Sequence, residues 1–328
     1  SAVDNIAARI RQILERQKLP PVGYRVCTLH KLASEIVRQR CDLVGLEEYF
    51  SIVDDTESER LMTSAAATWI EGHRAWWASF LPEDSEVRRK NAEEKWRAET
   101  REVGQGVMRF CKHQRLTPQQ AQKLAAAVPE EEFLRMGIDL YALYTTYLQA
   151  RSGLDFDDLI WRAIEALEQD KSFLLNLRAR WPYILEDEAQ DSSPLQERIL
   201  DRLSGEGGNW VRVGDPNQAI NSTFTSADPR YFRRFWERED VRHLSLSESG
   251  RCARPIIALA NHLVDWVVDS HPEMVVREMA FKRQHIQPTS PGDGQPNPPD
   301  EECHIRFGSR PFPDPKVQAS QVVRWASD

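Results

Sequence analysis

The alternation of apolar and polar residues divides the chain into short strands and amphipathic helices. Apolar side chains recur at helical spacing between residues 4 and 18, which predicts a helix near the start of the chain. The apolar runs Tyr24–Cys27 and Tyr183–Leu185 predict strands, and the second is of the kind found in buried parallel strands. Trp210–Val213 predicts another strand. Strands alternating with helices in this way predict an α/β fold with a parallel sheet.

Capping residues predict where several helices begin. Thr117 and Ser193 are each followed by proline and, three positions later, by glutamine, the pattern of a capping box with proline at the first helical position. Pro255 opens a further helix in the same way. Near the end of the sequence, Cys303–Phe307 predicts a strand and Gln318–Ala326 predicts a helix.

The segment 46–150 differs in composition from its neighbours, being helical in character and rich in Trp and Ala. From Arg88 to Arg115 it carries nine Lys or Arg residues against four Asp or Glu, in a chain whose net charge is −8. Such a run is usually a solvated helix face, and the backbone-tracking side of a DNA channel is the alternative. The aromatic residues predicted to pack inward are Trp69, Trp76, Trp77, Trp96, Tyr141, Tyr144 and Tyr147.

Composition sets limits on the class of protein. With 328 residues and 41% hydrophobic content, the chain can bury at least one core and is expected to form two or three units. The net negative charge argues against coating of nucleic acid by bulk attraction, although a local basic lining would suffice for a channel. The five scattered cysteines predict neither a disulfide framework nor a zinc site. Membrane spans and export signals are not expected, and cytoplasm is the default localisation.

Candidate chemistry lies where two predicted strands end. Because carboxylates are costly to bury, Asp187 and Glu188 are expected where the first strand emerges, the usual ligand position of open α/β sheets. The second strand runs into the turn Gly214–Gln218, which presents an uncharged amide, and a later loop carries Arg251. Together these groups suit a sensor for the γ-phosphate of a nucleotide. The alternative is a strand that simply meets solvent through acids.

At these positions the chain resembles the UvrD/Rep/PcrA group of superfamily 1 DNA helicases. DEAQD at 187–191 is similar to their motif II, GDPNQAI at 214–220 to motif III, and Arg251 in SGRC to the arginine of motif IV. Thr28-Leu29-His30 is similar to motif Ib, and the DFDDL sequence at 155–159 matches a further family segment. The resemblance spans nearly the whole chain, but only the central part of a helicase.

The resemblance implies an α/β fold with a RecA-like parallel-sheet motor domain, called 1A in the family. Domain 1A would comprise residues 1–45 and 151–245, without its P-loop strand. A helical insertion, 1B, would occupy residues 46–150. Residues 246–328 would begin a second RecA-like domain, 2A.

The resemblance also implies ATP and Mg²⁺ as cofactors. Asp187 would hold Mg²⁺, Glu188 would orient and deprotonate the attacking water, and Gln218 would sense the γ-phosphate. Arg251 would act as an arginine finger from across an inter-domain cleft. Gln190 would couple the nucleotide state to the grip on DNA. The residues implied are Glu188, Gln218 and Arg251 for catalysis, and Asp187, Gln190 and Asp215 for cofactor binding.

Single-stranded DNA and its junctions with duplex are the implied partners, with repair or recombination proteins as further candidates. Thr28 and His30 would contact phosphate or base, and Phe224 is the best candidate for stacking on a base. The alternative for Thr28 is a helix cap, with His30 an ordinary first-turn residue. The family's QxIYxFRGA appears here as QAINSTFTSA, so that Asn221 replaces a tyrosine and Thr225 stands where an arginine belongs.

A P-loop requires glycine followed by lysine, and none of the fifteen glycines precedes a lysine. Motifs V and VI are expected beyond residue 328. The leading hypothesis is therefore the central portion of an ATP-dependent DNA helicase, which alone should bind ATP poorly and hydrolyse little. A P-loop-less degenerate paralogue that serves as a DNA-binding or scaffold module is the alternative. A third reading is a Mg²⁺-dependent nuclease built on Asp187, Glu188 and Asp191.

Overall fold

The chain divides into two compact units, Ser1–Phe235 and Trp236–Asp328. The computed structural model describes residues 2–47, 49–82, 85–219, 229–303, 305 and 315–327. The elements of the first unit are α1 (Ala2–Arg16), α2 (Leu29–Gln39), η1 (Cys41–Val44), β1 (Ser51–Ile52), α3 (Asp55–Gly72), α4 (Arg74–Ala78), α5 (Glu86–His113), α6 (Pro118–Ala125), α7 (Glu132–Gln149), β2 (Gly153–Leu154), α8 (Phe156–Gln169), α9 (Lys171–Arg180), β3 (Tyr183–Glu186), η2 (Ala189–Asp191), α10 (Pro194–Ser204), β4 (Asn209–Arg212), η3 (Pro216–Gln218) and α11 (Pro229–Trp236), which ends one residue into the second unit.

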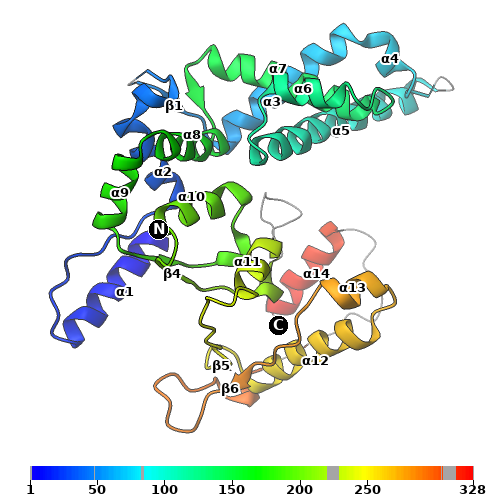
Figure 1. Cartoon of the computed structure of the whole chain (residues 1–328). Coiled ribbons are helices and arrows are strands. Elements are labelled where there is room, and N and C mark those ends of the chain that lie inside the picture. The colour runs from blue at the N-terminus through cyan, green and yellow to red at the C-terminus, as the bar shows by residue number, and fades with distance from the viewer. Residues whose placement is uncertain are drawn as a thin grey trace. The chain divides into compact units, whose positions relative to one another are not determined.

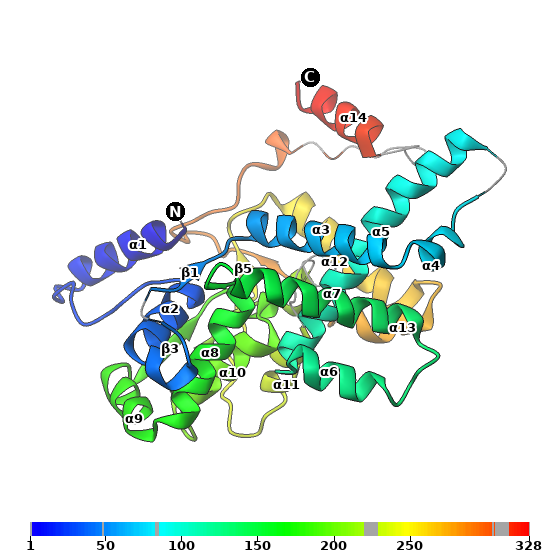
Figure 2. The same ribbon diagram turned by 90° about the horizontal axis from the view of Figure 1, so that it is seen from above.

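One hydrophobic core of the first unit lies within the helical segment between α3 and α7. Helix α7 packs against α3, α5 and α6, as Figures 1 and 2 show from two directions. The inward packing predicted for the aromatic residues is confirmed, since Trp69, Trp77, Tyr141 and Tyr144 are buried and Trp76, Trp96 and Tyr147 pack partly exposed against the same core. Each buried aromatic side chain contributes roughly 1.5 to 3 kcal/mol to folding.

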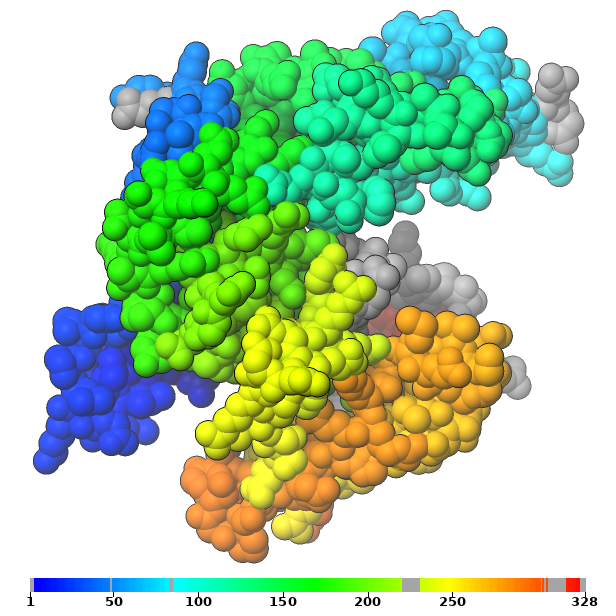
Figure 3. Space-filling model, viewed as in Figure 1, coloured from blue at the N-terminus to red at the C-terminus, as the bar shows by residue number. Residues whose placement is uncertain are grey.

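A second core lies beneath α2, α8 and α10. It combines buried side chains from residues 33–50 with others from residues 154–203, so it is assembled from both sides of the helical segment. Figure 3 shows the cyan and green atoms of α5, α7 and α8 as one continuous body. The capping boxes predicted at Thr117 and Ser193 are confirmed at the starts of α6 and α10.

The described residues are mostly helical, with three parallel sheets of two strands each. The sheets pair β1 with β2, β3 with β4, and β5 (Glu248–Ser249) with β6 (Gln287–Pro288). The prediction that the Tyr183–Leu185 strand is buried is wrong. Ile184 faces the second core, but Tyr183 is 67% exposed and Leu185 is 79% exposed. With only β4 paired to it among the described residues, β3 has one covered face and one open face.

The strand predicted at Tyr24–Cys27 is also wrong. This segment has irregular backbone up to Thr28 and no strand partner among the described residues. Its side chains are fixed by helices instead, because Arg25 forms an ion pair with Glu35 of α2 and lies over the Trp181 ring. A short apolar run without a neighbouring ladder therefore remained a loop.

The basic run on α5 is only partly a solvated face. Arg88, Arg89, Lys90, Lys95 and Arg97 are exposed, as that pattern predicts. Lys112, near the end of the same helix, is instead buried with 1% of its side chain exposed. Composition alone does not reveal such an exception, because the charges that hold it come from another helix.

The second unit begins with the last residue of α11. It contains β5 (Glu248–Ser249), α12 (Arg254–Ser270), α13 (Met274–Met279), β6 (Gln287–Pro288), η5 (Asp300–Glu302) and α14 (Pro315–Ser327). The helices predicted at Pro255 and near the end of the chain are confirmed in α12 and α14. The strand predicted at Cys303–Phe307 falls largely outside the described residues. Among the described helices, none has the length and apolar character needed to cross a membrane.

Candidate functional site

The carboxyl ends of β3 and β4 bring two predicted nucleotide loops side by side. Glu186 at the end of β3 is paired with Arg212 at the end of β4. The ladder continues past both strands, because the Val213 amide donates to the Glu186 carbonyl at 2.8 Å and the Ala189 amide donates to the Val213 carbonyl at 2.9 Å. The loop after β3 is therefore tied through its backbone to the loop after β4.

The Gln190 side chain joins these loops a second time. It is buried, with 2% of the residue exposed. Its amide nitrogen donates to Glu188 Oε2 at 2.7 Å, and its amide oxygen accepts from the Asp215 backbone N–H at 3.0 Å. Since a buried amide is costly to leave unpaired, both partners fix its orientation. The Gln190 side chain therefore links the second loop to the Glu188 carboxylate.

Glu188 has an unusual backbone conformation for a residue with a side chain. Its φ is 54° and its ψ is 41°, in the left-handed region. Such a conformation costs roughly 1 to 3 kcal/mol and tends to occur at functional sites. Asp187 and Glu188 are exposed, whereas Ala189 and Gln190 are buried. The turn therefore presents two carboxylates to solvent from a buried support.

Gly214 allows the close approach of the two loops. A β-carbon at this position would lie 2.5 Å from Gln190 Oε1 and 3.2 Å from the Ala189 backbone nitrogen. Any larger residue would displace the Gln190 amide from its hydrogen bond with the second loop. The glycine is required here by this contact, not by its own backbone conformation.

The second loop ends in a short 3₁₀ turn that places Gln218 beside Asp215. Asp215 Oδ1 accepts from the Asn217 backbone N–H at 2.9 Å, and Asp215 Oδ2 accepts from Gln218 Nε2 at 2.7 Å. The Gln218 side chain is exposed. The structure thus brings Asp187, Glu188, Gln190, Asp215 and Gln218 to one end of the β3–β4 sheet.

Beneath the two loops lies a buried ion cluster that sequence reasoning missed. The Arg212 side chain is 1% exposed and lies between two carboxylates, with Nε 2.7 Å from Glu186 Oε2 and Nη1 3.1 Å from Glu197 Oε2. Of its contacts to Glu186, the one in hydrogen-bond alignment is Nη2 to Oε1, at 3.3 Å. Trp210 Nε1 donates to the same Glu186 carboxylate at 3.2 Å. We call Glu186, Glu197 and Arg212 the Arg212 cluster.

The Arg212 cluster fixes the strand ends from which both loops start. The guanidinium also lies over the rings of Trp210, at 4.6 Å, and Phe235, at 5.0 Å. Burial raises the pKa of Glu197, and the Arg212 charge opposes that rise. The signal in the sequence was a charge of opposite sign at the end of each predicted strand.

The predicted DNA contacts Thr28 and His30 lie at the start of α2. Thr28 is the N-cap, and its hydroxyl accepts from the Lys31 backbone N–H at 3.2 Å, which confirms the capping alternative. Thr28 is exposed and His30 is half-buried, with its ring 4.6 Å from the ring of Phe156. Burial lowers the pKa of His30. Capping does not remove Thr28 from the surface, so the DNA role of both residues stays a prediction.

Of the predicted site residues, Arg251 lies in the second unit and Phe224 lies outside the described residues. Arg251 belongs to the second unit, where it is exposed after β5 and its backbone N–H donates to Ser249 Oγ at 3.4 Å. Phe224, with the departures at Asn221 and Thr225, falls outside the described residues. The predicted grouping of Arg251 with Asp187 and Gln218 therefore stays a prediction.

The donor chemistry at the β3 end suits a hard cation shared with phosphate. Mg²⁺ prefers oxygen ligands and is commonly held by one or two carboxylates together with nucleotide phosphates. The exposed Asp187 carboxylate fits that requirement. Among the described residues, no group of three or more His, Cys, Asp or Glu side chains is arranged to hold a metal ion by itself. The nuclease reading, which needs several converging acids, thus gains no support from them.

Comparison with known proteins connects this geometry to a family. ATP-dependent DNA helicase Rep of Buchnera aphidicola subsp. Baizongia pistaciae is 26% identical over 245 residues, which cover 73% of this chain and 31% of that protein. The Rep helicase of Escherichia coli is 25% identical over 267 residues, covering 80% and 35%. ATP-dependent DNA helicase UvrD2 of Mycobacterium tuberculosis is 35% identical over 130 residues, covering 38% and 18%.

The chain spans 18 to 35% of the length of these three relatives. The family model for the UvrD/REP helicase N-terminal domain matches residues 1–239. That range contains the start of α2, the helical segment and both loops at the ends of β3 and β4. The chain belongs to the UvrD/REP helicase N-terminal domain family.

Proposed function

We propose that this chain is the central portion of an ATP-dependent DNA helicase, which couples ATP hydrolysis to movement on single-stranded DNA and to duplex unwinding. The observation that carries the proposal is the link from Glu188 through Gln190 to the Asp215–Gln218 turn. Open α/β sheets bind ligands at this end of their strands. Membership of the helicase family and the helicase names of the relatives support the proposal.

The loops at the ends of β3 and β4 divide the nucleotide chemistry among their residues. Asp187 holds Mg²⁺, which when bound neutralises charge on the phosphates. Glu188 orients the attacking water and takes its proton, a role that contributes roughly 10²- to 10⁴-fold to the rate. Gln218 contacts the γ-phosphate, and Asp215 holds the Gln218 amide in place.

Gln190 and Arg251 connect this chemistry to movement. Gln190 contacts both loops, so a shift at Asp215 that follows phosphate release reorients Glu188. Arg251 of the second unit acts as the arginine finger, a group that contributes roughly 10³- to 10⁵-fold to phosphoryl transfer. Loss of the Glu188 carboxylate or of the Arg251 guanidinium should nearly abolish turnover.

The proposed domain division follows the two hydrophobic cores. Domain 1A comprises residues 1–45 and 151–245, 1B comprises 46–150, and 2A begins at 246. The first core lies entirely within the 1B range, and the second draws mainly on residues from both parts of 1A. An insertion with its own core, placed between two halves of another core, supports this division.

The proposed substrate is single-stranded DNA and its junction with duplex, with repair or recombination proteins as further partners. Thr28 contacts phosphate and His30 contacts phosphate or base, from the first turn of α2. Phe224 stacks on a base, which contributes about 1 to 3 kcal/mol. A surface of this kind recognises the backbone and ring faces of DNA, not its sequence.

The test is substitution of Glu188 by Gln in the full-length gene product. We expect ATP binding to be nearly unchanged and DNA-stimulated hydrolysis to fall by roughly 10²- to 10⁴-fold, because the amide cannot accept the water's proton. Glu206→Gln, at an exposed acid between α10 and β4, is the matched control and should retain activity. Unchanged turnover in Glu188→Gln would dispose of its proposed role.

A second candidate function is a P-loop-less module that binds DNA without hydrolysing ATP. It is favoured by one observation, the absence of any Gly-Lys step among the fifteen glycines of this chain. This candidate predicts that the full-length gene product binds single-stranded DNA with the same affinity whether or not ATP is present. The helicase proposal predicts an affinity that changes with nucleotide.

A further inference from the structure

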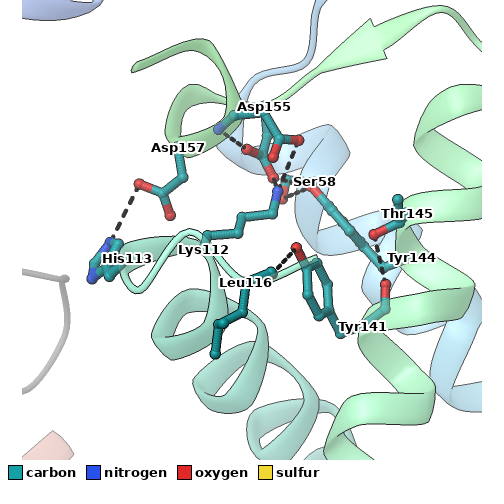
Figure 4. Close-up of polar contacts among 10 residues, drawn as sticks. Ser58, Lys112, His113, Leu116, Tyr141, Tyr144, Thr145, Asp155 and Asp157 are labelled. Carbon is teal, nitrogen blue, oxygen red and sulfur yellow. Dashed lines mark hydrogen bonds and ion pairs between the residues drawn. The ribbon is translucent and has the colours of Figure 1, made fainter. Parts of the chain in front are cut away.

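Lys112 is a buried ammonium near the end of α5 (Figure 4). Its Nζ forms ion pairs with Asp155 and, at 2.9 Å, with Asp158. The Tyr144 hydroxyl donates to Asp155 Oδ2 at 2.7 Å, and Ser58 Oγ lies 2.8 Å from the Tyr144 hydroxyl. We call these five residues the Lys112 cluster. Its members come from α3, α5 and α7 on one side, and from the start of α8 on the other.

The Lys112 cluster holds the first turn of α8. Asp155 is the N-cap of that helix, and its Oδ1 accepts from the Asp158 backbone N–H at 2.9 Å. Its other oxygen receives Lys112 and Tyr144. One carboxylate therefore both caps α8 and fastens that helix to α5 and α7. Since the two sides belong to different hydrophobic cores, the cluster is a joint between those cores.

The same turn of α8 also contacts the start of α2. Phe156, the first residue of α8, packs its ring 4.6 Å from the His30 ring. His113 Nε2 lies 3.5 Å from Asp157 Oδ1, which adds a second contact between the end of α5 and this turn. The first turn of α8 thus contacts the end of α5 on one side and His30 on the other.

We propose that Lys112 is a positioning residue for the DNA-contacting turn at Thr28 and His30. By holding Asp155 it fixes Phe156, and Phe156 supports the His30 ring. Lys112 is too deeply buried to contact DNA itself. This inference rests on the proposed function, which assigns the DNA contact to that turn.

The Lys112 ammonium offsets the repulsion between the Asp155 and Asp158 carboxylates. Two carboxylates share one cation in a buried space, so their mutual repulsion is held in check by Lys112. Without it the two acids must take up a proton or move apart, and moving apart shifts the first turn of α8. The titratable and charged groups that face the joint are Cys111, Lys112 and His113 of α5, Tyr141 and Tyr144 of α7, Asp155 at the α8 N-cap, and Asp157, Asp158 and Arg162 of α8.

The first experiment measures single-stranded DNA affinity in this chain. Lys112→Met is compared with Lys123→Met, which removes an exposed lysine from α6 of the same insertion. Binding of a fluorescein-labelled oligothymidylate is followed by anisotropy at one fixed salt concentration, because affinity for DNA depends on salt. We expect about tenfold or greater weakening for Lys112→Met, the scale of one lost base contact, and no more than about twofold for Lys123→Met.

Phe156→Ala provides a second variant in case Lys112→Met folds poorly. It removes the support of His30 but leaves the Lys112 cluster intact, and Phe156 is only partly buried. We expect it to weaken DNA binding as Lys112→Met does, with folding retained. Unchanged affinity in Phe156→Ala, or in a folded Lys112→Met, would overturn the inference.

A pH series separates the charge role of Lys112 from simple packing. With the ammonium gone, the pKa values of both carboxylates rise in the folded state, so thermal stability should fall as pH rises above the ordinary carboxyl value of 3.8 and recover on acidification. If the loss of thermal stability in Lys112→Met does not vary with pH, Lys112 contributes only packing and the inference is refuted. Failure of the unmodified chain to bind DNA would instead refute the proposed function.

Discussion

Two buried cations hold the first unit together, and the difference between them shows which joint depends on charge. The side chains of Lys112 and Arg212 are each 1% exposed, and each lies between two carboxylates. The acids beside Lys112 both come from the start of α8. The acids beside Arg212 come from β3 and α10.

The two cations also differ in the number of aromatic rings that surround them. The Arg212 guanidinium lies over the rings of Trp210, Phe232 and Phe235 at 4.6 to 5.7 Å. Lys112 lies 5.1 Å from one ring, that of Tyr144, whose hydroxyl is bonded to the same carboxylate as the ammonium. A planar, weakly hydrated guanidinium suits a ring-lined site, whereas an ammonium requires its charge partners. The Lys112 cluster is therefore the more sensitive of the two to loss of charge.

The largest effect is expected for Lys112→Met. Removing one partner of a buried ion pair costs roughly 3 to 5 kcal/mol, because the remaining charges are left uncompensated. The free energy of unfolding, measured in urea by circular dichroism at neutral pH, should fall by that amount. A loss below about 1 kcal/mol would show that the acids find other partners.

A smaller loss, about 2 to 4 kcal/mol, is expected for Arg212→Met, because the surrounding rings can pack against the new side chain. Glu197 is 20% exposed and can turn toward water, which lowers the cost further. The double variant Glu186→Leu with Arg212→Met removes both charges of the closest pair. It should recover most of the stability in the same urea experiment, and failure to recover would contradict the ring-packing explanation.

For Asp158→Asn, we expect the change in the free energy of unfolding with pH to become smaller by up to about 3 kcal/mol. Burial, followed by the charge of Asp155, raises the pKa of Asp158 to about 6, above its ordinary value of 3.8. The folded state therefore binds this proton more tightly than the unfolded chain, and stability from Asp158 is lost as pH rises from about 3.8 to about 6. Asp155 opposes this in part. Burial raises its pKa, but the Lys112 charge and the hydrogen bonds that the carboxylate accepts from the Asp158 backbone, Lys112 and Tyr144 together outweigh burial, so the pKa lies below its ordinary value.

The Asp158→Asn variant should accordingly show a flatter plot of unfolding free energy against pH than the unmodified chain. Glu197→Gln is the companion variant in the Arg212 cluster. The pKa of Glu197 is also raised, by burial, so its replacement should flatten the plot in the same direction. If the plot of unfolding free energy against pH keeps its slope in Asp158→Asn, residues other than Asp158 cause the pH dependence.

The smallest change in stability is expected for Gly214→Ala, about 1 kcal/mol. The added methyl group would meet Gln190 Oε1, so the amide must turn away from the Asp215 N–H and lose that hydrogen bond. The Arg212 cluster lies beneath the loops and should stay intact. In the full-length gene product, Gly214→Ala should abolish the change in DNA affinity that nucleotide causes while stability falls little. That result would show that the loops are coupled through Gln190. Gly106→Ala, at an open position on α5, is the control.

Local rules predicted much of the fold and the position of the candidate site. The caps at Thr28, Thr117 and Ser193, the inward aromatic residues and the ends of both strands follow from short-range patterns that the structure preserves. The joining of the DEAQD and GDPNQ loops followed from parallel strand order. Each of these inferences needed only a few neighbouring residues.

The features that were missed depend on residues far apart in the sequence. The basic run on α5 predicts a solvated face that includes Lys112, because Asp155 and Asp158 lie more than one helix away in the sequence. The pairing of Glu186 with Arg212 and the left-handed backbone of Glu188 likewise appear only when β3 meets β4. The wrong strand at Tyr24–Cys27 has the same cause, since a strand needs a partner that a local pattern does not supply.

The most direct measurement is ATP hydrolysis with and without single-stranded DNA, made on the full-length gene product and on this chain alone. The helicase proposal predicts that DNA accelerates hydrolysis by the full-length protein, and that this chain hydrolyses little or no ATP under either condition. Hydrolysis by the full-length protein that DNA leaves unchanged would contradict it, as would equal DNA-stimulated activity in this chain without a glycine-lysine phosphate loop.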